Sequence, residues 1–360
     1  MADVLRVRRQ PTIRDVADRA GVSTATVSRV LSGAPHARPA TRQRVFDAVG
    51  ELGYRPSAIA RSLKLRTTGT FGLIVTDILN PFFPELVRAI EDAARERGYA
   101  VLLGNGDEDP DREATYLEVL AERRVDGLLV ASGGLSERHG RWLQSTVMPV
   151  VLVNCELADG SRPAVLTDNR SASRLAAEHL LELGHRRLGH VTGRPTNAAT
   201  SERIVGIRDA LDAAGLGPEA LCLAEGDGHV VGGERATHAL LDRTPAPTGV
   251  LCYNDLTAIG AIRAVRARGL RVPGDVSVVG FDDIDLAAYV EPPLTTVSQG
   301  IVDIGHAAVA LLLEAIRTGT HHVDGAAAGG HAAPPAAPGI VRLPATLRVR
   351  SSTGPPRDGT

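Results

Sequence analysis

Apolar side chains near the start of the chain recur at the spacing of a helix with one buried face. Between residues 13 and 20 they fall at i, i+3, i+4 and i+7, namely at Ile13, Val16, Ala17 and Ala20. This spacing predicts a short amphipathic helix. Thr12 can cap this helix, and the Asp15 carboxylate three residues on can reach back to its open amides.

A second short helix is predicted after a turn at Gly21 and Val22. Ser23 can cap it, and its buried face is formed by Val27, Val30 and Leu31. Its outer face carries small and polar groups and then a guanidinium, at Thr24, Ala25, Ser28 and Arg29. Such a surface can lie close in the major groove and offer donors to base edges. An ordinary helical hairpin with a solvated face is the alternative.

Beyond a third predicted helix at 41–52, which Gly53 ends, short apolar runs alternate with helical stretches. The runs are 71–78, 100–105, 125–132, 149–154 and 164–168, then 187–193, 248–255 and 276–283. The helical stretches are 84–97, 111–123, 135–145, 171–184, 201–214, 232–242 and 256–268. Buried runs separated by helices predict parallel sheets covered on both faces. Two such series predict an α/β core of two lobes, with a ligand between them at the carboxyl ends of the strands.

Charge is spread unevenly along the chain. The formal net charge is only -2, but residues 1–68 carry 12 Arg and Lys64 against five acids, a balance of +8, so the remainder carries -10. A basic head on an acidic body favours binding to a phosphate backbone and predicts that this binding is sensitive to salt.

The cysteines and the apolar runs indicate where the protein works. Cys155, Cys222 and Cys252 are odd in number and lack metal-ligand spacing, which favours a reducing, cytoplasmic compartment. The first ten residues have no apolar signal-peptide core, and no apolar stretch is long enough to span a bilayer. We therefore expect an internal protein that has no membrane partner.

The sequence contains no catalytic constellation that we can identify. The glycine-rich stretches 102–110 and 189–197 follow strands, but neither is GxGxxG or carries GK[ST]. There is no nucleophile elbow and no HExxH pair. The histidines His179, His185, His190 and His238 lie at spacings that define no metal site, and packed or solvated histidines are expected. We predict no enzymatic activity, no cofactor and no metal.

Five segments give the chain its resemblance to a known family. They are residues 12–31, GYRPSAIARSL at 53–63, NPFF at 80–83, VVGFDD at 278–283 and PPLTTVSQ at 292–299. In this order and spacing the chain resembles the LacI/GalR family of transcriptional repressors, from about Thr12 to about Ser352. The resemblance implies a small all-α DNA-binding head and a two-lobed, periplasmic-binding-protein-like α/β core with parallel sheets.

The resemblance also implies domain boundaries. The head is expected at 1–55, a hinge helix and linker at 56–69, the first lobe at 70–168 plus about 299–320, and the second lobe at 169–298 plus about 340–350. Residues 321–339 depart from the family pattern, and their Gly, Ala and Pro content indicates a flexible surface insertion. His321, His322, Asp324 and His331 within it could instead bind a metal. No heptad pattern follows Arg350, so a dimer is expected rather than a coiled-coil tetramer.

For the head, the family resemblance implies binding to double-stranded operator DNA as a homodimer on a palindromic site. Base-reading positions correspond to Thr24, Ala25 and Arg29. Phosphate-binding positions correspond to Thr12, Ser23, Thr26, Ser28 and Thr41, for which plain helix capping is the alternative. In the hinge, Leu63 holds the place of a leucine that is wedged into the minor groove, and Lys64 flanks it.

For the core, the resemblance implies a small-molecule effector site formed by Arg203, Asn254 and Asp282. Such groups suit vicinal hydroxyls, and Phe82 and Phe83 offer an aromatic plate for a sugar ring. Asn154 and Gln299 are candidates of second rank. Core packing is the alternative for Phe83, and a structural turn is the alternative for Asp282 and is favoured for Asp283.

Three functions are compared on this basis. A sugar-controlled repressor in the cytoplasm, associated with the nucleoid, is favoured; the same fold with a purine or nucleoside corepressor is the alternative. Gly228 stands where many family members carry an aromatic residue, so one wall of the effector pocket is expected to differ. A secreted sugar-binding transport protein is disfavoured by the basic head and the absent signal peptide, and an α/β enzyme by the absent catalytic residues.

Overall fold

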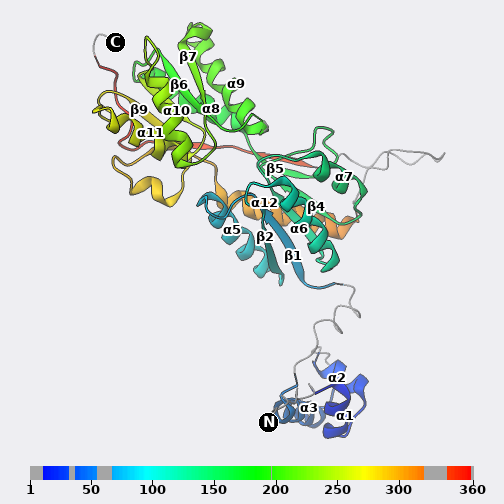
Figure 1. Ribbon diagram of the computed structural model, residues 1–360. Helices are drawn as coiled ribbons and strands as arrows, with labels where there is room; N and C mark the ends of the chain where they lie inside the picture. The colour runs from blue at the N-terminus through cyan, green and yellow to red at the C-terminus, as the bar shows by residue number, and fades with distance from the viewer. Residues whose placement is uncertain (1–10, 32–36, 55–66, 196, 320–338, 358–360) are drawn as a thin grey trace, which may run out of the picture. The chain divides into compact units, whose positions relative to one another are not determined.

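The computed structural model describes residues 11–31, 37–54, 67–195, 197–319 and 339–357. The chain forms two compact units, residues 1–68 and 69–360 (Figure 1). The hinge residues 56–66, with Leu63 and Lys64, and nearly all of the predicted insertion lie outside the described residues.

The first unit is a three-helix head. Its helices are α1 (Ile13–Ala20), α2 (Thr24–Leu31) and α3 (Pro39–Leu52). The predicted capping box of Thr12 and Asp15 is present, and Gly21 closes α1 in the left-handed conformation (φ 63). Val16, Val27 and Val45 are fully buried where the three helices meet. The third helix begins at Pro39, two residues before the predicted start, because proline is preorganised for the first helical position.

The second unit contains two six-stranded sheets (Figure 1). The first sheet is parallel throughout, in the order β11-β5-β4-β3-β1-β2. Its strands are β1 (Thr70–Val75), β2 (Ala100–Asn105), β3 (Gly127–Ala131), β4 (Val150–Val153), β5 (Ala164–Thr167) and β11 (Ile340–Leu343). Alternate strand residues pack on the two faces. Leu73 and Leu129 face α5 (Phe82–Glu96) and α12 (Ile301–Thr318), whereas Ile74 and Leu128 face α6 (Pro110–Glu122) and α7 (Glu137–Ser145).

The second sheet has the order β12-β10-β9-β8-β6-β7, and only β12 runs antiparallel to its neighbour. Its strands are β6 (Leu188–Thr192), β7 (Leu221–Glu225), β8 (Gly249–Cys252), β9 (Ser277–Asp282), β10 (Thr295–Ser298) and β12 (Thr346–Arg348). The helices α8 (Asn169–Glu182) and α9 (Ala198–Ala213) pack together on one face. The other face is covered by α10 (Val230–Leu241) and α11 (Asp255–Ala267). Two 3-10 turns complete the lobe, η1 (Pro218–Ala220) and η2 (Asp285–Ala288).

The predicted architecture of two parallel sheets covered by helices is confirmed. The chain crosses between the sheets at 167–169, 298–301 and 343–346. One assignment is wrong in part. Residues 340–350 were expected in the second lobe, but β11 pairs with β5 in the first sheet and only β12 joins the second. Strands β7, β10, β11 and β12 were absent from the predicted runs. Strand β7 is a half-buried edge strand, so its apolar signal is weak.

Helices α10 and α11 cross at a contact that requires glycine. A Cβ added at Gly260 would lie 2.1 Å from the carbonyl oxygen of Val230, and one at Gly233 would lie 2.4 Å from that of Thr257. The two backbones therefore approach more closely than any side chain would permit.

The histidines of the core belong to its packing. His185 and His190 are buried, and Nδ1 of His190 donates to the carbonyl oxygen of Leu251 at 3.0 Å. Burial lowers the pKa of His190 to about 4. His179 and His238 lie on α8 and α10.

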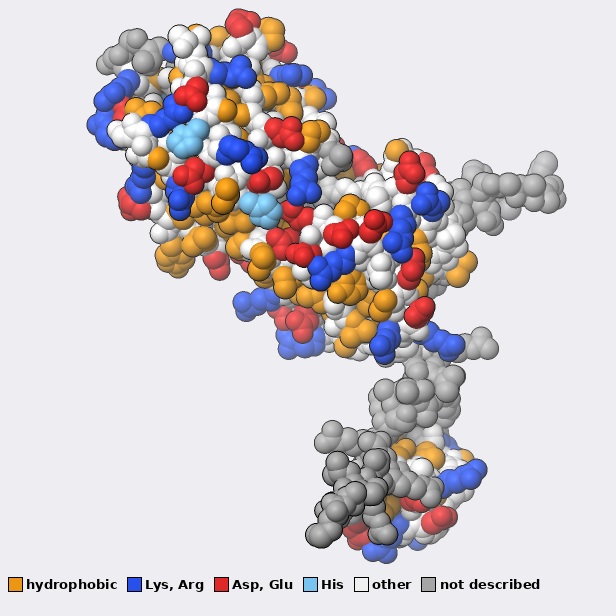
Figure 2. Space-filling view, viewed as in Figure 1, with side chains coloured by type: hydrophobic (Ala, Val, Ile, Leu, Met, Phe, Trp, Pro, Cys, Tyr) orange, Lys and Arg blue, Asp and Glu red, His pale blue; other side chains and the backbone are white. Residues whose placement is uncertain are grey.

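Basic and acidic side chains are mixed over the visible face of the core (Figure 2). No helix in the described part of the chain is long and apolar enough to cross a membrane.

Candidate functional site

The outer face of α2 presents the predicted base-reading residues. Thr24, Ala25 and Arg29 are exposed, and Arg29 Nε donates to the carbonyl oxygen of Ala25 at 3.3 Å. The guanidinium is thus held along the same face as the two small residues. A helix with this profile can approach base edges closely and offer a charged donor at one end.

The predicted phosphate-binding residues of the head also stabilise its helices. The Thr12 hydroxyl donates to Asp15 at 2.8 Å, and the Ser23 hydroxyl accepts from the Thr26 amide at 3.2 Å. Capping and phosphate binding are compatible, because a hydroxyl has both a donor and acceptor lone pairs. Ser28 and Thr41 are half-buried.

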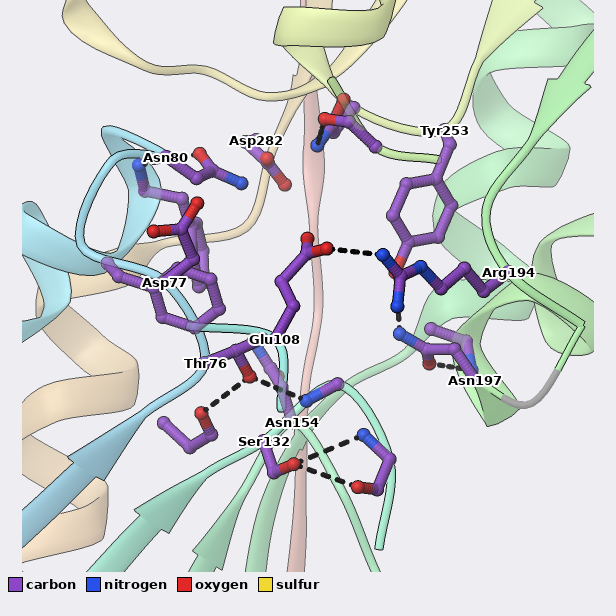
Figure 3. A pocket seen from close by; sticks show the side chains of 18 of the residues that line it. Thr76, Asp77, Asn80, Glu108, Ser132, Asn154, Arg194, Asn197, Tyr253 and Asp282 are labelled. Atoms are coloured by element: carbon purple, nitrogen blue, oxygen red, sulfur yellow. Dashed lines mark hydrogen bonds and ion pairs between the residues drawn. The ribbon is translucent and has the colours of Figure 1, made fainter. Parts of the chain in front are cut away.

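A cavity of about 380 Å³ lies between the two lobes of the core. It is lined by the segments that follow the strands of both sheets (Figure 3). Its polar residues include Thr76, Asp77, Glu108, Ser132 and Asn154 from the first lobe and Arg194, Arg203, Tyr253, Asn254 and Asp282 from the second. This is the edge of the sheets at which the strand-and-helix pattern predicted a ligand.

A chain of hydrogen bonds joins Asp282 to the first lobe. Gln299 Nε2 donates to Asp282 Oδ1 at 2.5 Å, and Gln299 Oε1 accepts from the Thr167 hydroxyl at 2.6 Å. Asn154 Nδ2 lies 3.4 Å from the same oxygen of Gln299. Burial raises the pKa of Asp282 to about 7, although Arg203 and the Gln299 bond act in the opposite direction.

Arg203 is held rigidly by the second lobe. Its side chain is buried, its Nε donates to Asn169 Oδ1 at 2.9 Å, and its Nη1 donates to the carbonyl oxygen of Tyr253. The guanidinium carbon lies 3.5 Å from the ring centroid of Phe281 and 4.7 Å from that of Tyr253. Stacking and hydrogen bonds together fix the guanidinium at the wall of the cavity.

Asn254 serves the fold as well as the cavity. Its Oδ1 accepts from the Thr257 amide at 2.9 Å and hydroxyl at 2.7 Å, which caps α11. Its Nδ2 donates to the carbonyl oxygen of Gly228 at 2.9 Å. Gly228 has φ 88, a conformation that disfavours side chains. Gly228 thus stands where many family members carry an aromatic residue, and Asn254 fixes its backbone by a hydrogen bond.

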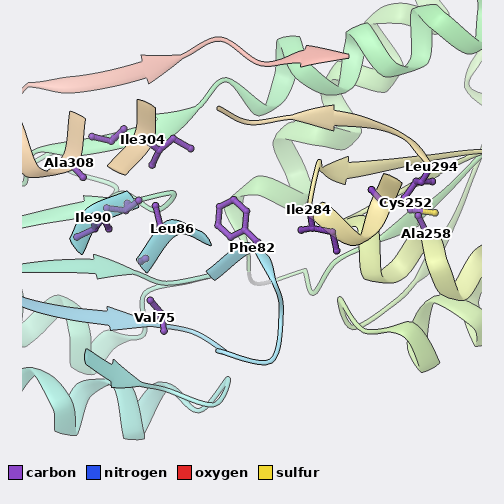
Figure 4. Packing of buried hydrophobic residues seen from close by; sticks show 14 of the residues in the cluster. Val75, Phe82, Leu86, Ile90, Cys252, Ala258, Ile284, Leu294, Ile304 and Ala308 are labelled. Atoms are coloured by element: carbon purple, nitrogen blue, oxygen red, sulfur yellow. The ribbon is translucent and has the colours of Figure 1, made fainter. Parts of the chain in front are cut away.

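Phe82 and Phe83 pack against the apolar core and also line the cavity. Their rings meet edge to face with centroids 5.3 Å apart, and both line the cavity. Phe82 is 5% exposed and points toward Ile284 of the second lobe, in the apolar cluster that continues through both lobes (Figure 4). Phe83 is half-buried against the same cluster, so packing and cavity lining coexist there. Asp283, interpreted as structural, pairs with Arg350 at 2.7 Å.

Several lining residues were missed by the sequence reading. The most prominent is Glu108, whose Oε2 lies 2.5 Å from Arg194 Nη2 and whose Oε1 lies 3.0 Å from His229 Nε2. Asp77, Glu108 and His229 each bring one ligand-type atom within 4.8 Å of the others. Arg194 already neutralises the Glu108 carboxylate, so this ion pair explains why Glu108 lies close to His229 without a metal ion. The absence of a metal site stays a prediction.

A helix-turn-helix head joined to a two-lobed α/β core with a cavity at the strand ends defines a ligand-responsive DNA-binding regulator. Residues 12–57 match the family described as bacterial regulatory proteins, lacI family. Residues 68–327 match periplasmic binding proteins and sugar binding domain of LacI family. The chain belongs to the LacI family, which confirms the resemblance found in its sequence. It is a DNA-binding transcriptional regulator with a core for small molecules.

Relatives and solved structures agree over most of the chain. It is 40% identical to the HTH-type transcriptional repressor PurR of Aliivibrio salmonicida over 86% of this chain and 93% of that protein. It is 36% identical to catabolite control protein A of Priestia megaterium, over 95% and 99% of the two chains. The Lac repressor dimer bound to operator and the anti-inducer ONPF matches with a TM-score of 0.84 and 28% identity, over 96% of this chain and 100% of that one. A complex of the transcriptional regulator CelR with cellobiose matches with a TM-score of 0.70 and 33% identity, over 95% and 99%.

Proposed function

We propose that this protein represses transcription by binding a palindromic operator as a homodimer, under the control of a small sugar-like effector in the cavity between the lobes. The observation that carries the proposal is the cavity itself, which Arg203 on α9 and Asp282 at the end of β9 both line. A guanidinium and a carboxyl can each bond two neighbouring hydroxyls. Phe82 and Phe83 add apolar surface for a sugar ring.

The solved structures of two relatives support the sugar class, and neither identifies the ligand of this chain. CelR is described with cellobiose, and a LacI family regulator from Enterococcus faecium with bound ribose. Purines remain the alternative class, to be tested in the same screen. We infer that the protein is a regulator rather than an enzyme, and that it acts at the nucleoid in the cytoplasm, since its partner is DNA.

In the operator complex, α2 of each head is proposed to enter the major groove. Thr24, Ala25 and Arg29 would contact base edges there. Thr12, Ser23, Thr26, Ser28 and Thr41 would hold phosphates. Leu63 of each hinge would be wedged at the central step, flanked by Lys64. The hinge would couple the core to the DNA.

Replacement of Arg29 tests the DNA-binding half of this proposal. Against a palindrome enriched from a random pool by the wild-type protein, Arg29→Ala should lose roughly ten- to a hundredfold in affinity, because a base contact by arginine is worth about 1–3 kcal/mol. Binding to a scrambled duplex should change much less. Fluorescence anisotropy at fixed salt measures both affinities.

Arg19→Ala is the matched control. It removes the same charge from α1, where Arg19 pairs with Glu51 at 2.6 Å, and should leave the ratio of cognate to scrambled affinity unchanged. An Arg29→Ala ratio equal to that of the control would exclude α2 as the base-reading helix.

A further inference from the structure

The cavity between the lobes is acidic. Among the residues that the structure describes, five carboxylic acids, two arginines and one histidine line it, and the acids are Asp77, Glu108, Glu113, Asp227 and Asp282. An anionic ligand that enters such a cavity meets carboxylates at short range, and like charges disfavour its binding.

Glu108 forms an ion pair with Arg194, one of the two arginines that line the cavity. Glu108 follows β2 in the first lobe, and its carboxylate pairs with Arg194 of the second lobe at 2.5 Å (Figure 3). The same carboxylate lies 3.0 Å from Nε2 of His229, also in the second lobe. Its backbone is in the left-handed region (φ 56), with the amide donating to the carbonyl oxygen of Thr76 at 3.0 Å. Asp107 before it is also left-handed (φ 59) and pairs with Arg112 at 2.7 Å. The loop is therefore fixed in a shape that projects Glu108 into the cavity.

The second arginine, Arg203, is bonded to other residues of the second lobe. Arg203 donates to Asn169 and to the carbonyl oxygen of Tyr253, and its plane lies over Phe281. It can still present an edge to a neutral hydroxyl. A phosphate that approached Arg203 would also meet Asp282, which lines the same cavity.

We propose that Glu108 determines the charge class of the effector: by holding Arg194 and His229 it excludes phosphorylated ligands and reserves the cavity for uncharged polyhydroxy compounds. The inference rests on the proposed effector function of this cavity. Removal of the Glu108 carboxylate alone would expose a guanidinium and an imidazole to the cavity, which is the donor set that a phosphate prefers.

Inorganic phosphate tests this inference without knowledge of the effector. In Glu108→Gln, phosphate at constant ionic strength should raise the melting temperature more than it does in wild type, because a ligand that binds the native state stabilises it. Glu118→Gln is the control; Glu118 lies on α6 and pairs with Arg138 at 3.0 Å. Phosphate should raise the melting temperature of Glu118→Gln by the same amount as that of wild type. In the double variant with Glu108→Gln and Arg194→Gln, the additional rise seen in Glu108→Gln should disappear. Equal responses of Glu108→Gln and Glu118→Gln would overturn the proposal.

Pairs of neutral and phosphorylated ligands give a second readout. Ribose with ribose 5-phosphate, and glucose with glucose 6-phosphate, are compared by calorimetric titration. For any pair of which one member binds, wild type should bind the neutral member with at least tenfold higher affinity than the phosphorylated one. In Glu108→Gln this ratio of affinities should be at least tenfold smaller. A wild-type preference for the phosphorylated member that Arg203→Ala abolishes would refute the role of Glu108 while leaving the effector cavity intact. Binding that neither Arg203→Ala nor Asp282→Asn affects would refute the cavity itself.

Discussion

Arg203→Ala is expected to abolish effector binding in a protein that still folds but melts at a lower temperature, because the guanidinium packs on Phe281 and donates to Asn169. The measurement is a thermal-shift screen of pentoses, hexoses, disaccharides, polyols, nucleosides and purines, in which at least one class should stabilise wild type. Loss of the guanidinium removes a charged donor and leaves polar groups of the ligand buried without a partner, at about 1.5–3 kcal/mol for each lost bond. We therefore expect the affinity to fall roughly a hundredfold or more for two such bonds.

Asp282→Asn and Arg208→Ala make this test specific. Asp282→Asn keeps the shape of the side chain and should also remove the thermal shift. Arg208→Ala removes an exposed arginine from the same helix α9 and should behave like wild type. A ligand that still stabilises both Arg203→Ala and Asp282→Asn would show that it binds elsewhere.

Gly260→Ala is expected to destabilise the core strongly. Its new Cβ would lie 2.1 Å from the Val230 carbonyl oxygen and 2.6 Å from the Glu234 amide nitrogen, both of them backbone atoms of α10. The helices must move apart, and overpacking of this kind costs about 3 kcal/mol. Urea unfolding of the full-length protein should show a lower midpoint, and the free energy of unfolding should fall by that amount.

Gly140→Ala on α7 controls for helix propensity. A Cβ there meets no atom within 4 Å, so the substitution should leave stability unchanged or raise it by up to about 1 kcal/mol. If Gly260→Ala unfolded at the same urea concentration as Gly140→Ala, the close crossing of α10 and α11 would be wrong.

The head could be predicted from the sequence almost in full, because its determinants are local. The stripe of Val16, Ala17 and Ala20, the turn at Gly21 and the cap at Ser23 lie within a few residues of each other, and each acts through its immediate neighbours. The alternation of apolar runs and helices likewise predicted two sheets. It could not predict that β11 joins the first sheet, since a four-residue strand carries little pattern of its own.

The effector cavity was predicted only in part. Asp282 lies in one of the five segments that carry the family resemblance, the resemblance also implied Arg203, and the structure places both at the cavity. Glu108 and Arg194 lie in turns that resemble ordinary strand ends, and 86 residues separate them. The periodicity of apolar residues predicts local secondary structure, so it cannot predict a contact between residues of different lobes. The rule that ligands bind at the carboxyl ends of strands could have identified these turns as candidates.

The central claim is that occupancy of the cavity controls binding to DNA. The most direct test titrates full-length protein into the labelled palindrome enriched from a random pool, with and without the ligand that stabilises wild type. Coupling between sites in such proteins changes affinity about 5- to 150-fold. We predict a change of at least tenfold in the apparent Kd of wild type and none in Asp282→Asn. A ligand that binds the cavity of wild type yet leaves its affinity for the palindrome unchanged would contradict the account.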